Sequence, residues 1–258
     1  MSWMFPRRSG IRAPEPREWI LGALYLPVFL FFLNFAILTY FPALGFPLTE
    51  PRNYFFANLL YMTVNFAVML LIFRRTLWQS LREFEGKMLL SVLIGFGMCY
   101  GANLVLTTAY TVLDIMPENY NQEAVNSLLG GYPLAMTLCT VVLAPLAEEC
   151  LFRGVLFAPL ARRCLPAAYA LSMFLFAGMH VFQFLGSMTA ANTILCLSLY
   201  LPASFSLCWV YQKTGNIWAC IFLHMFINFQ SVLASLLRSL MQSRRPSGLR
   251  KTMRHFNS

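Results

Sequence analysis

Two adjacent carboxylates and a guanidinium stand in an otherwise apolar run of this sequence, VVLAPLAEECLFRGVLFAPL at residues 141–160. Glu149 and Arg153 are four residues apart, so on a helix they share one face and can form an ion pair. Glu148 is rotated by about 100° from Glu149 around such a helix and points elsewhere. The spacing therefore predicts a buried structural pair, Glu149 with Arg153, beside a free carboxylate, Glu148, that is available for chemistry.

Two of the three histidines of the chain also lie in apolar runs. His180 stands in FLFAGMHVFQF, four residues after Phe176, and His224 stands in WACIFLHMFINFQ, four residues before Asn228. Each of these groups, taken singly, can serve as a hydrogen bond between membrane helices. Ionisable groups in three separate apolar runs are costly, however, and such groups mark functional sites by default. The pattern favours one shared site over packing alone.

These side chains have two chemistries open to them. A carboxylate and an imidazole can activate a water molecule, while a second imidazole and a carboxamide can donate hydrogen bonds to a developing oxyanion. Imidazole and carboxylate groups are also ordinary ligands of zinc, although the sequence has no H-E-x-x-H motif. No Ser or Cys has a base placed beside it by a local motif, which disfavours a covalent nucleophile. Either way the expected reaction is hydrolysis of an amide bond.

The composition decides which solvent surrounds these groups. The chain has 258 residues, of which 59% are hydrophobic and only 11% are charged, whereas soluble domains have about 25% charged residues. The net charge of +9 comes from basic residues in tails and loops, so we expect no nucleic-acid partner. The seven cysteines form no C-x-x-C pair and are expected to be apolar packing residues. These features indicate a polytopic membrane protein.

Seven apolar segments are long enough to cross a bilayer, which takes about 20 residues. They are residues 19–42, 54–73, 88–113, 132–160, 167–185, 190–211 and 216–238. Pro145 interrupts the fourth segment one turn before the carboxylates, where we expect a kink. The predicted fold is an all-α transmembrane bundle of about seven spans, with six to eight open, and an active site in a cavity between helices.

The basic residues predict the orientation of the bundle. The N-terminal tail has four arginines and the second loop has four Lys or Arg, whereas the first loop has one and the third has none. This alternation predicts a cytoplasmic N-terminus, although the basic C-terminal tail breaks the pattern. The three spans with the candidate residues share their predicted cytoplasmic ends near residues 160, 167 and 216. We therefore expect the cavity to open toward the cytoplasm.

Three motifs in order carry a resemblance to a known family. EECLFR at residues 148–153 fits E-E-x-x-x-R, FAGMH at residues 176–180 fits F-x-x-x-H, and HMFIN at residues 224–228 fits H-x-x-x-N. Over residues 130–235 the chain resembles the CPBP family, which comprises type II CAAX prenyl proteases, bacteriocin-processing enzymes and Abi proteins. The resemblance implies an integral-membrane endopeptidase that hydrolyses peptide bonds inside a cavity between helices.

The resemblance also implies a role for each matching residue. Glu148 and His180 would activate the attacking water, His224 and Asn228 would stabilise the oxyanion, and Glu149, Arg153 and Phe176 would support them. If a metal is bound, its ligands would be Glu148, His180 and His224. The cofactor stays open between Zn²⁺ or another divalent metal and none, with the water activated by Glu148.

The predicted organisation has four parts. They are a cytoplasmic basic N-terminal tail at residues 1–18, N-terminal transmembrane helices and loops at 19–130, a CPBP-type catalytic core at 131–238, and a basic polar C-terminal tail at 239–258. The expected setting is a bacterial plasma membrane, with the lipid bilayer and a peptide or membrane-protein substrate as partners. A non-catalytic scaffold or bacteriocin-immunity protein with the same fold stays open, as does a transporter, which the absence of an inverted repeat in the sequence disfavours.

Overall fold

The computed structural model describes residues 11–243, and within that range the chain is helical with no strand. Seven helical passages are long and apolar enough to cross a membrane: Pro16–Ala43, Pro51–Ile72, Met88–Val112, Pro133–Ala161, Leu165–Ser187, Ala190–Thr214 and Ile217–Met241. The prediction of an all-α polytopic bundle of about seven spans is confirmed, with edges that differ from the predicted ones by three residues or fewer.

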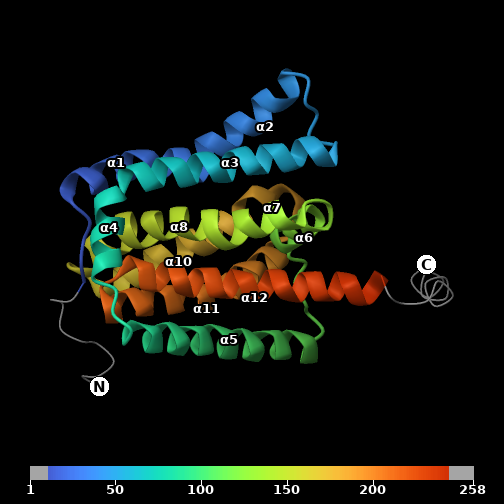
Figure 1. Ribbon diagram of the computed structural model, residues 1–258. Coiled ribbons are helices and arrows are strands. Elements are labelled where there is room, and N and C mark those ends of the chain that lie inside the picture. Colours follow the sequence, from blue (N-terminus) through green and yellow to red (C-terminus); the bar gives the residue numbers. More distant parts are fainter. Residues whose placement is uncertain (1–10, 244–258) are drawn as a thin grey trace.

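Several passages are divided into shorter elements. In chain order the elements are α1 (Pro16–Pro27), η2 (Val28–Phe32), α2 (Leu33–Ala43), α3 (Pro51–Ile72), α4 (Arg74–Arg82), α5 (Met88–Val112), α6 (Tyr120–Gly131), α7 (Pro133–Leu138), η3 (Cys139–Leu143), α8 (Ala144–Glu149), η4 (Cys150–Phe157), α9 (Ala158–Ala161), α10 (Leu165–Val181), η5 (Phe182–Ser187), α11 (Ala190–Thr214) and α12 (Ile217–Ser243). Two of them, α4 and α6, are too short to cross a membrane and lie at opposite ends of the bundle (Figure 1).

The fourth passage, from α7 to α9, lies at the centre of the bundle. In Figure 1 it runs between α3 on one side and α12 on the other, and α8 packs against both of them. It is also the most buried passage, with 44% of its apolar window inside the protein. Large apolar side chains on the surrounding helices, such as Phe35, Leu71 and Val105, are exposed, as expected for helices that face lipid.

Two π-helical segments shape this central passage. Pro145 has no N–H to donate to the carbonyl four residues earlier, so an ordinary α-helix cannot continue through it undisturbed. The π-helical turn η3 ends two residues before Pro145, and a second π-helical segment, η4, begins directly after Glu149. The disturbance expected at Pro145 thus takes the form of π-helical turns, which often occur at functional sites.

The N-terminal helices are packed tightly against the central passage. A Cβ atom at Gly22 would lie 2.6 Å from Val155 Cγ2, and one at Gly154 would lie 2.8 Å from Phe73 Cε1. Trp19 Nε1 donates a hydrogen bond of 3.0 Å to the Val155 carbonyl. Because glycine alone permits such close approach without displacing a neighbour, α1, α3 and η4 form one packed unit.

The predicted division of the chain at residues 130 and 131 stays a prediction. The expected tails at residues 1–18 and 239–258 fall partly on residues 1–10 and 244–258, which lie outside the described residues. All seven cysteines are described, and none forms a disulfide. Six of them are buried, as expected of packing residues, and Cys164 is exposed.

Candidate active site

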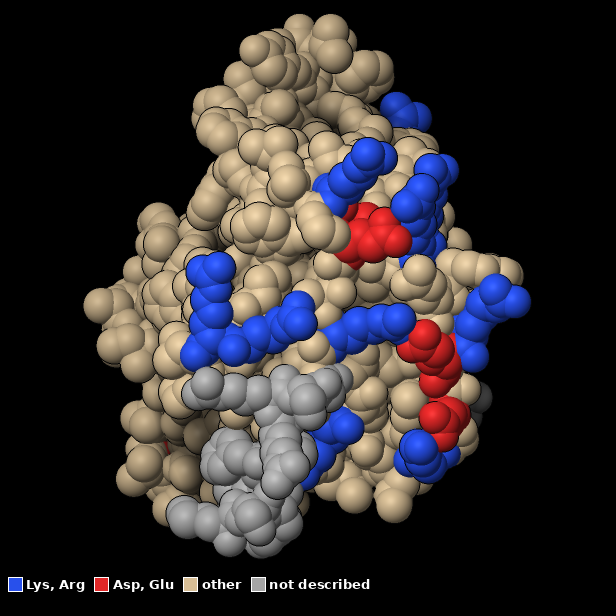
Figure 2. All heavy atoms as spheres, turned by 90° about the vertical axis from the view of Figure 1, so that its left-hand side faces the viewer, with Lys and Arg blue, Asp and Glu red and all other residues tan. Residues whose placement is uncertain are grey.

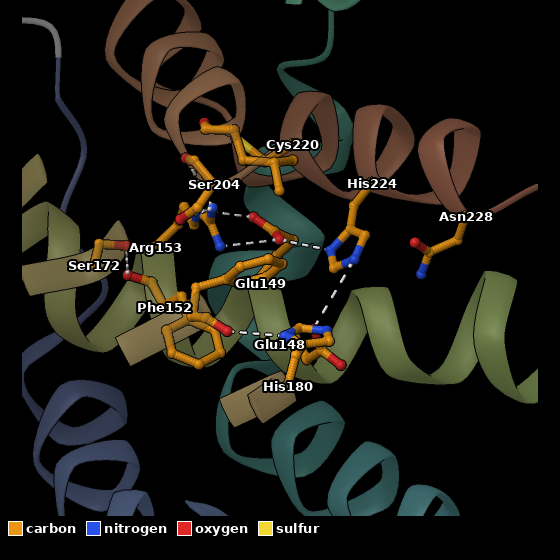
Figure 3. A network of polar contacts seen from close by, with 12 residues as sticks. Glu148, Glu149, Phe152, Arg153, Ser172, His180, Ser204, Cys220, His224 and Asn228 are labelled. Carbon is orange, nitrogen blue, oxygen red and sulfur yellow. Dashed lines mark hydrogen bonds and ion pairs between the residues drawn. The ribbon is translucent and has the colours of Figure 1, made fainter. Parts of the chain in front are cut away.

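The candidate residues of three different passages meet near the middle of the bundle (Figure 3). Glu148 comes from α8, His180 from the last turn of α10, and His224 and Asn228 from successive turns of α12. His224 Nε2 lies 3.9 Å from Glu148 Oε2. Side chains separated by up to 80 residues in the sequence therefore surround one point of the interior.

Glu149 and Arg153 form the ion pair that their spacing predicts. Both side chains are fully buried, with 3.1 Å between Arg153 Nε and Glu149 Oε2 and 3.2 Å between Arg153 Nη1 and Glu149 Oε1. Arg153 Nη2 also donates to the Ser204 carbonyl at 3.2 Å. A buried charge needs both a counter-charge and hydrogen bonds, and this pair has both.

Glu149 has a second contact that the sequence did not suggest. Its Oε1 accepts a hydrogen bond of 2.8 Å from His224 Nδ1, which connects α8 directly to α12. An imidazole that donates through Nδ1 carries no proton at Nε2 when it is neutral. Glu149 thus orients the His224 ring with Nε2 toward Glu148, in addition to its pairing with Arg153.

His180 is oriented in a similar way. Its Nδ1 lies 2.8 Å from the Phe176 carbonyl, which can only accept, so Nδ1 is the donor. In the neutral ring Nε2 is therefore an acceptor. The Phe176 ring is in the middle of the cluster, with its centroid 5.0 Å from Arg153 Cζ, 4.9 Å from the His180 ring and 5.6 Å from the His224 ring.

A cavity of about 760 Å³ adjoins this cluster, and Glu148, His180 and Asn228 line it. Glu148 Oε2 is buried and has no hydrogen-bond partner among residues 11–243. Asn228 Nδ2 donates to the Thr140 carbonyl at 2.8 Å, which leaves its second N–H for another acceptor. His224 is not part of the lining and contacts Glu148 from behind.

From the sequence we expected the cavity to open toward residues 160, 167 and 216, but its lining residues lie elsewhere. Its other lining residues include Leu38 near the end of α2, Tyr54 in the first turn of α3, Gln122 in α6 and Ser231 in α12. These residues lie toward the opposite end of the bundle, the end where α6 lies (Figure 1). The expected direction was wrong because it considered only the nearest helix ends and not which halves of the helices surround the hollow.

Several other lining residues escaped the sequence reasoning. Tyr200 of α11 stacks on the His180 ring, with centroids 4.5 Å apart, and donates through its hydroxyl to Asn119 Oδ1 at 3.0 Å. Thr140 has a buried hydroxyl with no partner in the described part of the chain. Asn58 and Asn65 of α3 line the wall that the N-terminal helices contribute. Asn58 and Asn65 could have been found from the sequence, because they are two carboxamides seven residues apart in an apolar span.

The donor groups do not form a metal site in this arrangement. Among the described residues no three His, Cys, Asp or Glu side chains are grouped so as to hold a metal ion. The hydrogen bonds at Nδ1 of His180 and His224 leave both Nε2 atoms bare, as in histidine ligands of metals, but His224 Nε2 is 3.9 Å from the nearest Glu148 oxygen. We therefore derive no catalytic step through a metal.

Seven membrane-spanning helices around a cavity with buried carboxylates and imidazoles define an integral multi-pass membrane protein with an enzyme-like site. Residues 130–230 match the family described as Type II CAAX prenyl endopeptidase Rce1-like. The chain is also 28% identical over 174 residues to "Putative membrane peptidase YdiL" of Bacillus subtilis (strain 168), which covers 66% of this chain and 67% of that protein. No solved structure matches the chain.

These matches confirm the resemblance predicted from the sequence. Over residues 130–230 the chain is similar to the CPBP family of membrane proteases, which supports that resemblance. The three motifs lie inside that range, and so do all four residues to which the resemblance assigned catalysis. The two matches support a membrane protease in general terms, and they leave the catalytic mechanism open.

Proposed function

We propose that the protein is an integral-membrane endopeptidase in which Glu148 and His180 activate a water molecule for attack on a peptide bond. One observation carries this proposal: Glu148 lines a cavity together with His180 and Asn228, and one of its carboxylate oxygens is buried without a hydrogen-bond donor among the described residues. A buried carboxylate oxygen without a hydrogen-bond donor is costly, because it has lost its hydration. In the proposed mechanism the attacking water donates the missing hydrogen bond to the Glu148 carboxylate.

The roles follow from the hydrogen-bonding capacity of each group. The water donates one proton to Glu148 and is held by the bare Nε2 of His180, while its oxygen attacks the carbonyl carbon. The carbonyl oxygen becomes an oxyanion, which accepts the free N–H of Asn228. Glu148 then returns its proton to the amide nitrogen, the C–N bond breaks to give an amine and a carboxylic acid, and the acid loses its remaining proton to Nε2 of His180.

His224 has a different role in this scheme from the one that the family resemblance implied. It does not line the cavity, and its Nε2 faces Glu148. We assign it the positioning of the Glu148 carboxylate in its protonated form, in which Nε2 carries a proton toward Glu148 while Glu149 holds Nδ1 from the other side. Asn228 remains the oxyanion donor.

The test is a comparison of membrane proteomes from cells that express the wild type, Glu148→Gln or Glu123→Gln. Glu123 is a carboxylate of α6 outside the cavity lining, so its variant is the matched control. We expect peptide termini that depend on wild type and on Glu123→Gln and that disappear in Glu148→Gln. If Glu148→Gln yields the same termini at the same rate, the endopeptidase assignment fails, and a scaffold or immunity role takes its place.

We also propose that the N-terminus is cytoplasmic and that the cavity extends toward the outer face of a bacterial plasma membrane. Nine of the described Lys and Arg side chains lie at the end of the bundle seen in Figure 2: Arg12, Arg17, Arg74, Arg75, Arg82, Lys87, Arg162, Arg163 and Lys213. At the opposite end the described basic residues are Arg52 and Arg238. Positive charge is retained on the cytoplasmic side, which supports this orientation.

Cys164 makes the orientation testable, because it is the exposed cysteine of the chain and follows Arg163 at the basic end. A membrane-impermeant maleimide should label it only after the cells are permeabilised, and Cys164→Ser is the control for background. Met116, 56% exposed at the opposite end, provides the complementary reporter as Met116→Cys in the Cys164→Ser protein. Labelling of Cys164 in intact cells would reverse the proposed orientation.

A further inference from the structure

A stripe of polar residues runs along the cavity-facing side of α3, in the part of the chain that precedes the family match. It consists of Tyr54, Asn58, Tyr61 and Asn65, which we call the α3 stripe, and all four line the cavity. Their spacing of four, three and four residues places them on one helix face. Carboxamides are unfavourable in a membrane helix unless they meet polar partners, so the stripe calls for a functional explanation.

The hydrogen bonds made by the two asparagines of the stripe leave one amide group of each without a partner. Asn65 is 2% exposed, and its Oδ1 accepts from the Tyr25 hydroxyl at 3.0 Å, but its buried Nδ2, with the Tyr61 hydroxyl nearby, has no hydrogen bond of normal geometry within residues 11–243. Asn58 Nδ2 donates to the Tyr54 carbonyl at 2.9 Å, and no donor to its Oδ1 occurs among the described residues. The stripe thus has one unused donor, buried at the cavity wall in Asn65, and one unused acceptor, in Asn58.

The main chain of a peptide that is cleaved inside a membrane protein needs hydrogen-bond partners of this kind. A helical segment must unwind before water can attack its main chain, and unwinding exposes N–H and C=O groups in a cavity of low polarity. Each such group is costly to bury without a partner, and a carboxamide can supply either the donor or the acceptor that is missing.

The spacing of the free groups also fits an extended chain. Asn58 and Asn65 are seven residues apart, which is about 10 Å along a helix. An extended peptide rises about 3.3 Å per residue, so the same distance corresponds to about three peptide residues. A main-chain N–H at one position and a carbonyl three residues away can therefore meet the acceptor and the donor together.

We propose that the α3 stripe is a main-chain binding subsite for an extended apolar peptide segment. Asn65 donates to a carbonyl of that segment, and Asn58 accepts one of its N–H groups. The apolar side chains of the segment contact Phe31, Phe35 and Leu38, which line the cavity nearby. This inference rests on the proposed endopeptidase only in treating the bound segment as a substrate. Binding by the α3 stripe can be measured without any cleavage.

The experiment measures binding of an octapeptide of alternating Leu and Ala, dansylated at one end and amidated at the other, to detergent-solubilised protein. Its twin is N-methylated at each Leu and has fewer main-chain donors. The protein carries Glu148→Gln in every case, so that the peptide is not consumed. Asn58→Leu and Asn65→Leu are compared with Asn103→Leu, an asparagine of α5 that contacts Cys99 Sγ and does not line the cavity.

We expect the unmethylated peptide to bind to the Asn103→Leu control about fivefold more tightly than its twin, the value of one hydrogen bond. In Asn58→Leu this preference should vanish, because the acceptor for the N–H is gone. Asn65→Leu should weaken binding of both peptides about equally, since it removes a donor to a carbonyl that both retain. Folding of each variant is checked by its elution as a single species in size-exclusion chromatography.

Two outcomes would overturn the inference. In one, neither peptide binds to the control protein. In the other, both peptides bind equally to the control and to the stripe variants, which would favour an acyl or isoprenoid chain as the occupant. The proposed endopeptidase is tested separately by the proteome comparison. If the unmethylated peptide binds more tightly than its twin but no cleavage is found, the subsite is supported and the endopeptidase is not. If cleavage is found but both peptides bind equally, the endopeptidase is supported and the subsite is not.

Discussion

Replacing Glu149 should damage the protein in two separable ways. The side chain neutralises Arg153, which is fully buried, and it accepts the His224 Nδ1 proton at 2.8 Å. Glu149→Leu leaves the guanidinium without its counter-charge, and breaking a buried pair in this way costs about 3–5 kcal/mol. For a chain of this size that loss lowers the melting temperature by about 6–20 °C.

The double variant Glu149→Leu/Arg153→Met separates the two roles. Replacing both partners of a buried pair by apolar residues of similar volume is often neutral, so most of the lost stability should return. Activity should not return with it, because His224 still has no acceptor at Nδ1 and no longer directs Nε2 toward Glu148. The expected result is a protein that melts within about 3 °C of the wild type and cleaves at least about 100-fold more slowly.

The assays are thermal unfolding in detergent and cleavage of a peptide from the proteome comparison. Glu148→Gln serves as the contrast, because Glu148 Oε2 accepts no hydrogen bond among the described residues and its nearest charged group, His224 Nε2, is 3.9 Å away. That variant should be as stable as the wild type and inactive. The reasoning fails if Glu149→Leu alone melts like the wild type, or if the double variant cleaves at the wild-type rate.

Three further predictions concern other contacts of the site and the basic end. Tyr200→Leu should slow cleavage about tenfold and change its pH profile, because the ring stacked on His180 is lost, whereas Tyr200→Phe keeps the stack and most of the rate. A hydrogen bond from Arg12 lowers the pKa of Glu83 below its usual value of 4.5. The stability that this contact contributes is present above pH 4.5 and is lost as the pH falls through the lowered pKa. The difference in melting temperature between the wild type and Glu83→Gln should therefore shrink in acid and in high salt. Incubation with EDTA or phenanthroline should leave cleavage unchanged, and a loss that added zinc restores would instead require a rearranged Glu148–His180–His224 set.

The helices of this protein were predictable because a membrane helix can be recognised from its own stretch of sequence. Twenty consecutive apolar residues need no knowledge of their neighbours to be recognised, and the predicted spans agree closely with the observed helices. The Glu149–Arg153 pair was predictable for the same reason, since both residues belong to one helix and their spacing fixes their common face.

Contacts between helices could not be predicted in this way. The bond from His224 to Glu149 joins residues 75 positions apart, and no local period relates them. The stacking of Tyr200 on His180 and the direction of the cavity depend likewise on how complete helices are rotated and packed. Asn58 and Asn65 were visible in the sequence as costly residues, but only the structure places them on the cavity wall.

The two halves of the chain contribute different things to the cavity. The motif residues and the ion pair come from three of the four passages in the matched range, and in the proposed mechanism they supply acids, bases and one oxyanion donor. The opposite wall comes from α2 and α3, and it supplies apolar surface and carboxamides that no step of the hydrolysis requires. Close contacts at Gly22 of α1 and at Gly154, which lies against Phe73 directly after α3, pack the N-terminal helices against η4. Under the two proposals, catalysis and substrate recognition depend on different parts of the fold, and changes on α3 should alter which peptides are cleaved without altering how they are cleaved.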